Sequence, residues 1–145
     1  MSTRAVYTFT GSQGDFHVYK HHDGYPYASD GVSEGGGLIW IKKAKALAWD
    51  LPEFQSDEFA AAFVAANKTR PNRGDVYLTE DPLRHADAEY WYKLKKATPA
   101  LDVWVDVYEV DVYEVDWNQK PTNTLIMDGA LSDLLTSERA RRPVA

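Results

Sequence analysis

Residues 101–116 read LDVWVDVYEVDVYEVD, and this stretch decides the fold class. From 101 to 108, Leu and Val alternate with Asp, Trp and Tyr, which predicts a strand with its valines on one face. Residues 105–109 (VDVYE) are repeated at once as 110–114. Because five is odd, the repeat turns equivalent residues to opposite faces of a strand. We therefore expect a bulge or bend near Glu109, or a longer insertion into the hairpin.

Further strands are predicted on both sides of this stretch. Residues 4–10 and 16–22 are β-branched or aromatic-rich and flank a turn cluster at 11–15, which indicates an N-terminal hairpin. Residues 75–79 form a short strand. Residues 89–94 should pair with 101–108 as a second hairpin, and 124–127 form a final strand.

Two central helices interrupt the strands. Residues 38–50 are predicted to form a helix, because apolar residues recur at three- and four-residue spacing from Trp40 to the residue after the helix: Trp40, Ala44, Leu47, Ala48 and Leu51. Residues 57–66 form a second helix, capped by Ser56 or Asp57, and 130–139 form a short third one. Leu47, Phe59 and Phe63 are expected in the core between the helices and the sheet.

The predicted order is ββααββββα, in which strands come in runs and do not alternate with helices. This order indicates an α+β fold, a mostly antiparallel sheet with the two central helices on one face. A chain of 145 residues fits a single domain, 1–145, with residues 140–145 frayed.

Composition excludes several classes of function. The chain has no cysteine, which rules out disulfides and thiolate chemistry, and its net charge of −6 argues against binding to duplex nucleic acid. It has no membrane-length apolar run and no secretory signal pattern. We expect a cytoplasmic protein without cofactors.

The residues best suited to bind a ligand are concentrated in three predicted loops, and they are called here the three-loop group. A tight turn at 23–26 (DGYP), in which we expect a positive φ at Gly24, follows a cation and two imidazoles. Rings stack on bases, cations hold phosphates, and carboxylates bind ribose hydroxyls, so the group suits a nucleotide-sized ligand. The proposed ligand-binding residues are Lys20, His22, Asp23, Tyr25, Tyr27, Asn67, Arg70, Arg73, His85 and Tyr90.

Other constellations give weaker signals. His21 and His22 point to opposite sides of a strand, so no metal site is predicted. No serine stands in a nucleophile-elbow context, and we expect no enzymatic activity. The strand at 101–116 could instead mimic nucleic acid through its acids, or be a charged edge: Asp102, Asp106, Glu109, Asp111, Glu114 and Asp116.

Three segments resemble a family of small phage and prophage accessory proteins. They are residues 19–26 (YKHHDGYP), 48–68 and 85–92, and the similarity spans roughly residues 4 to 130. The resemblance implies a viral anti-defence protein of the infected bacterial cytoplasm. It would act as a sponge, a homo-oligomer that sequesters a cyclic oligonucleotide or ADP-ribose-derived immune signal without cleaving it. The alternative is an anti-CRISPR-like inhibitor that binds a protein through the acidic strand.

Overall fold

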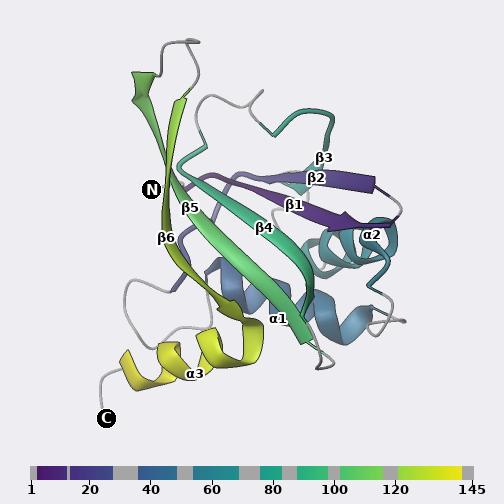
Figure 1. The fold of residues 1–145 in the computed structure, drawn as a ribbon. Helices are drawn as coiled ribbons and strands as arrows, with labels where there is room; N and C mark the ends of the chain where they lie inside the picture. The colour runs from purple at the N-terminus through teal and green to yellow at the C-terminus, as the bar shows by residue number, and fades with distance from the viewer. Residues whose placement is uncertain are drawn as a thin grey trace.

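The computed structural model describes residues 3–12, 14–27, 36–48, 54–68, 76–82, 88–97, 102–115 and 121–141, with the backbone alone at 111–115, 121–122 and 137–141. Within these ranges the chain folds as α+β, in the predicted order ββααββββα (Figure 1). The elements are β1 (Ala5–Gly11), β2 (Gly14–Lys20), α1 (Gly37–Leu47), α2 (Ser56–Asn67), β3 (Val76–Thr79), β4 (Tyr90–Ala97), β5 (Asp102–Val115), β6 (Pro121–Ala130) and α3 (Leu131–Arg141).

The described strands form one six-stranded sheet in the order β3-β2-β1-β4-β5-β6. Neighbours pair antiparallel except β1 and β4, which are parallel. The chain leaves β2, passes through both central helices and β3, and returns on the far side of β1. The parallel pair therefore joins the N-terminal hairpin to the C-terminal strands.

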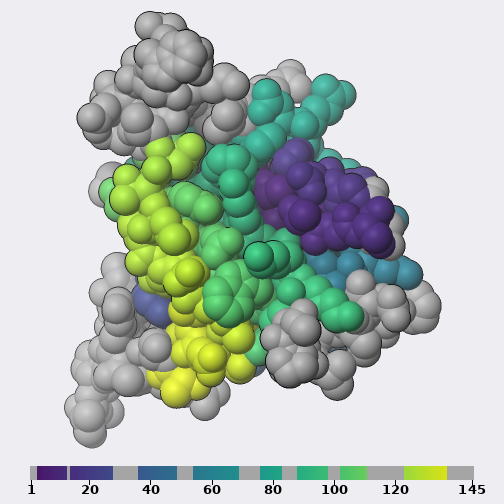
Figure 2. Space-filling model, viewed as in Figure 1, coloured from purple at the N-terminus to yellow at the C-terminus, as the bar shows by residue number. Residues whose placement is uncertain are grey.

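Helices α1, α2 and α3 pack against the same face of the sheet. Their apolar residues join the residues of β1, β4 and β5 that point to this side, including Tyr7, Phe9, Tyr92 and Val105. Within the described chain no helix covers the opposite side, called here the helix-free face. Figure 2 shows this face, with β1, β4, β5 and β6 running across it.

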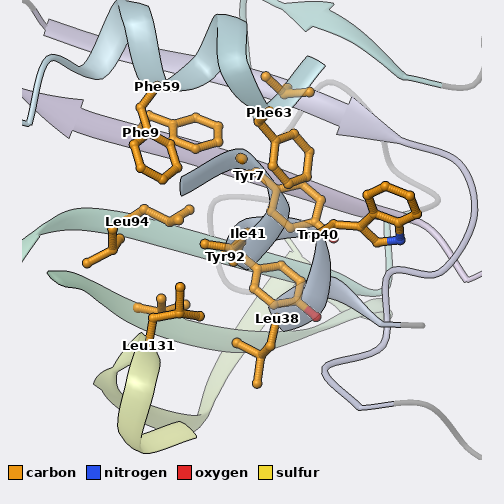
Figure 3. Packing of buried hydrophobic residues seen from close by; sticks show 14 of the residues in the cluster. Tyr7, Phe9, Leu38, Trp40, Ile41, Phe59, Phe63, Tyr92, Leu94 and Leu131 are labelled. Atoms are coloured by element: carbon orange, nitrogen blue, oxygen red, sulfur yellow. The ribbon is translucent and has the colours of Figure 1, made fainter. Parts of the chain in front are cut away.

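The core is built on aromatic rings. Phe63 lies 4.4 Å from Tyr7 and 5.7 Å from Phe9 between ring centroids, and Tyr7 stacks on Tyr92 at 4.5 Å (Figure 3). Phe59 and Phe63 are buried, as predicted. The prediction for Leu47 is wrong, because this side chain is 55% exposed.

Leu47 is exposed because it lies in the last turn of α1. The buried residues of this helix end at Ala44, one turn earlier. Ala48 packs against the core from the partly exposed rim, and Leu51 lies outside the described residues.

Two register shifts interrupt the pairing of β5 with β6 near the tandem repeat, but the first has its extra residue in β6 and so does not re-phase β5 as expected. Val107 is opposite Met127 whereas Tyr108 is opposite Leu125, so one residue of β6 is passed over. A second irregularity separates Asp111 from Val115, where the extra residues belong to β5. These two shifts flank Glu109, and the strand continues to Val115 rather than ending near 108.

Candidate functional site

The turn at 23–26 binds the start of helix α1. The amide of Gly37 donates to the carbonyl of Tyr25 at 2.7 Å, and the amide of Leu38 donates to that of Pro26 at 3.4 Å. Gly36, the N-cap of α1, has a φ of 102° and offers no side-chain cap. Because the first amides of a helix lack partners within it, the turn carbonyls serve as the cap.

The prediction of a positive φ at Gly24 is wrong. The positive φ, 58°, belongs to Asp23, a residue type that tolerates this region. Gly24 is required for a different reason, close approach: a Cβ there would lie 2.7 Å from the Thr3 carbonyl oxygen and 2.8 Å from the Ala5 Cβ. Its carbonyl accepts a 2.5 Å hydrogen bond from the buried Tyr92 hydroxyl.

Two of the proposed ligand-binding residues bind each other inside the protein. The Lys20 ammonium donates to Asn67 Oδ1 at 2.7 Å and lies 4.8 Å from the centroid of the Trp40 ring. Asn67 Nδ2 in turn donates to the Phe63 carbonyl at 2.8 Å. Both side chains are buried, so in this structure they hold α2 against the sheet and present no surface to a ligand.

The other described members of the three-loop group are partly buried and also have partners within the protein. Tyr25 donates to Asp23 Oδ1 at 3.1 Å, and Tyr27 donates to the Leu134 carbonyl at 3.3 Å. The His22 ring packs edge-on against His21, with centroids 4.7 Å apart. The described side chains around the turn therefore mainly contact other residues of the protein.

Tyr90, a further member, packs half-buried against the core. Burial raises the pKa of its phenol, and the charges of Glu109 and Glu89 raise it further. Arg70, Arg73 and His85 lie outside the described residues, so their role as ligand contacts stays a prediction.

A different set of side chains forms a continuous row across the helix-free face. The strand registers place one residue from each strand side by side. From β3 to β6 this row, called here the aromatic row, consists of Tyr77, Tyr19, Val6, Trp91, Tyr108 and Leu125. Four of the six are aromatic, and Val6 separates them into two pairs.

The two pairs differ in exposure. Tyr19 and Tyr77 have ring centroids 5.3 Å apart, and Tyr77 is 44% exposed while Tyr19 is buried beneath its neighbours. Trp91 and Tyr108 have centroids 6.1 Å apart, and both are half-buried. The Lys93 ammonium lies over this second pair, 4.2 Å from the Trp91 centroid and 5.0 Å from that of Tyr108.

The orientation of Trp91 is fixed by a chain of hydrogen bonds across three strands. Its Nε1 donates to Thr8 Oγ1 at 2.8 Å, and the Thr8 hydroxyl shares a further hydrogen bond of 2.8 Å with His17 Nδ1. Burial lowers the pKa of His17, although the Asp15 and Asp81 carboxylates oppose this effect. The lowered pKa favours the neutral imidazole, which has one donor and one acceptor nitrogen.

Positive and negative side chains occupy different parts of the helix-free face. Arg4 Nε donates to His21 Nδ1 at 3.3 Å beside the first aromatic pair, and Lys93 lies at the second. On the other side, Asp106 of β5 is directly opposite Asp128 of β6. These two acids and Trp104 line an open groove of about 560 Å³, together with Lys95, Lys96 and Ala97.

The acids of β5 do not act as one uniform surface. Asp102 is buried and accepts hydrogen bonds from the Ser132 hydroxyl at 2.5 Å and from the Val103 amide at 2.8 Å, with Lys45 3.3 Å away. Although burial alone would raise its pKa, these hydrogen bonds and the lysine hold the pKa of Asp102 below its ordinary value. This residue ties α1 and α3 to the sheet and is unavailable to a partner protein.

Comparisons with protein-family models, with curated proteins and with solved structures give no match for this chain. None of the helices in the described ranges is long and apolar enough to cross a membrane.

Proposed function

We propose that this protein binds a nucleotide on the helix-free face of its sheet and holds it without cleaving it. The observation that supports the proposal is the aromatic row, in which Trp91 and Tyr108 lie beneath the ammonium of Lys93. Bases stack on such rings whatever their sequence, and an adjacent cation attracts the phosphate.

The energies favour binding despite the internal contacts of Lys93. Stacking contributes about 1–3 kcal/mol per base. The contact of a half-buried ammonium such as that of Lys93 with a ring contributes about 0.5–2 kcal/mol. A charge-assisted hydrogen bond to a phosphate contributes about 1.5–3 kcal/mol. A ligand phosphate therefore competes successfully for Lys93, and the rings are released for the base.

The biological role that we propose is sequestration of a small nucleotide immune signal, as the resemblance to phage accessory proteins suggests. A cyclic oligonucleotide or an ADP-ribose derivative combines base, ribose and phosphate in one compact ligand. We propose Trp91, Lys93 and Tyr108 as the contacts in place of the 23–26 turn, whose described residues hold α1.

A second candidate is binding to a basic partner protein through β5 and β6. It is favoured by the register that brings Asp106 and Asp128 face to face, since like charges in this position cost stability unless another group compensates them. Lys93, opposite Asp106 on β4, provides part of this compensation within the chain.

Calorimetry with cyclic dinucleotides, cyclic trinucleotides and cyclic ADP-ribose isomers tests the first proposal. We expect Lys93→Met to weaken binding about tenfold or more, as loss of one charge-assisted contact implies. Lys42→Met makes the same change of charge at an exposed position of α1 and should leave affinity unchanged. Equal losses in both variants, or no binding by the wild type, would contradict the proposal.

The same calorimetry, run beside a host-immunity assay, distinguishes the second candidate function from the first. Replacing Asp106 and Asp128 with Asn should preserve nucleotide binding if the aromatic row is the site. If the protein instead inhibits an effector through these acids, the Asn variant loses inhibition in a host-immunity assay while Lys93→Met retains it.

A further inference from the structure

The aromatic row carries information on the size of the ligand. Its four rings are not evenly spread: Tyr77 and Tyr19 lie on the adjacent strands β3 and β2, and Trp91 and Tyr108 lie on the adjacent strands β4 and β5. Between the pairs runs β1, which contributes the small, buried Val6 to the row. The face therefore offers two separate stacking positions.

The distance between the two positions excludes a stacked arrangement of the bases. Because Tyr19 is buried, the two bases would stack on Tyr77 and Trp91, whose strands β3 and β4 are three strand spacings apart. Since neighbouring strands are about 4.8 Å apart, the two strands are separated by roughly 14 Å. Stacked bases are only about 3.4 Å apart, so two bases bound here would be unstacked, each on its own ring.

The cations of the helix-free face are placed to bind a phosphate that lies above β1. Arg4 lies two residues before Val6, immediately before β1 begins, and donates to His21. Lys93 is opposite Thr8, two residues after Val6. A link between two nucleosides crossing Val6 would therefore have a positive charge on either side. Asp106 and Asp128 are one and two strands beyond Lys93, and Asp15 lies on β2 four residues before Tyr19, beyond His17.

From this arrangement we infer that the ligand contains two bases joined through phosphate, one base over Tyr77 and the other over Trp91 and Tyr108. The inference rests on the proposed function, since it specifies the ligand of the same face. It favours a dinucleotide, linear or cyclic, over a mononucleotide or an ADP-ribose derivative with one base.

Binding of AMP, linear ApA and cyclic di-AMP to the full chain tests the inference by calorimetry. We expect at least one of the two dinucleotides to bind about tenfold or more tightly than AMP, as a second stacked base implies. Tyr77→Ala should bring the affinity of that dinucleotide close to that of AMP and leave AMP binding unchanged.

Leu78→Ala is the matched control. Leu78 neighbours Tyr77 on β3 and is 65% exposed, but it pairs with Val18, whose side chain points to the helices. It should change neither affinity. Trp91→Leu, which keeps apolar volume and removes the indole face, should weaken AMP and dinucleotide alike by about tenfold.

The outcomes distinguish the inference from the proposed function. If AMP binds as tightly as both dinucleotides, or if Tyr77→Ala and Leu78→Ala have equal effects, the two-base inference is overturned while nucleotide binding stands. If none of the three probes binds and the wider panel of cyclic nucleotides also fails, both are overturned. Circular dichroism of each variant confirms that the sheet remains folded.

Discussion

Replacement of Phe63 by alanine should remove a large part of the stability of this protein. The ring is fully buried and packs between Tyr7 and Phe9, at the point where α2 meets β1. An aromatic side chain of this kind removes roughly 150–250 Å² from water, which at 25 cal/mol per Å² contributes about 4–6 kcal/mol. Alanine keeps a small part of this burial, and core substitutions of this type cost about 3–5 kcal/mol.

Urea unfolding followed by circular dichroism measures this loss. For a chain of this length, about 3–5 kcal/mol corresponds to a melting temperature lower by roughly 6–20 °C. Leu47→Ala is the matched control, because Leu47 is also apolar and helical but 55% exposed, and it should cost no more than about 0.5 kcal/mol. A cooperative Phe63→Ala variant that loses less than about 1 kcal/mol would refute the described packing of α2.

Three further predictions concern the turn, the α3 contact and the histidine of the helix-free face. Gly24→Val should destabilise the fold by about 1–3 kcal/mol, because its Cβ would meet the backbone of Thr3; an unchanged melting temperature would contradict this. Asp102→Asn should cost about 1.5–3 kcal/mol at pH 7 by weakening the contacts of α3. Since the pKa of Asp102 is lowered in the fold, the difference from wild type should shrink as pH falls below 3.8, and a constant difference would argue against it. The pKa of His17 is also lowered, but this group is neutral when deprotonated, so its contribution is present above pH 6.5 and is lost as pH falls below that value. His17→Gln should flatten the pH dependence of stability in this range, and an unchanged profile would exclude His17 as its source.

Much of the fold could be predicted from local sequence patterns. Alternation identified the strands, and the three- and four-residue spacing identified the helices, because each pattern reflects which side of an element is buried. The repeat at 105–114 predicted a re-phasing of β5 near Glu109, whereas β5 runs in unbroken register from Tyr108 to Asp111 and the extra residue beside Tyr108 is in β6. Leu47 was misplaced because a stripe of apolar residues does not show where the neighbouring elements end.

The candidate site was harder to predict, because it depends on which strands are neighbours. Trp91 comes beside Val6 only through the parallel pairing of β1 with β4, which no local pattern reveals. Nor could sequence show that Lys20 would bind Asn67 in the interior, since the two are separated by 47 positions. The available signal was the alternation of side chains along each strand. It places Tyr19, Tyr77, Trp91 and Tyr108 on the face of the sheet that points away from the core.

The expected homo-oligomer stays a prediction. The edge strand β6 carries the exposed Leu125 and Ile126, and the mass of the protein in solution, measured by light scattering, decides whether copies associate. A monomeric mass across the concentrations used for ligand binding would contradict the expectation.

The central claim is that the helix-free face holds a nucleotide, and mass spectrometry of ligands released by heat tests it most directly. Protein would be purified from cells that make cyclic nucleotide signals, as wild type and as a variant carrying Trp91→Leu and Tyr108→Leu. We predict that the wild type releases a nucleotide in near-stoichiometric amount and that the folded double variant releases less than about a tenth as much, as the loss of stacking implies. A wild type that releases no nucleotide, or a double variant that retains it fully, would contradict the claim.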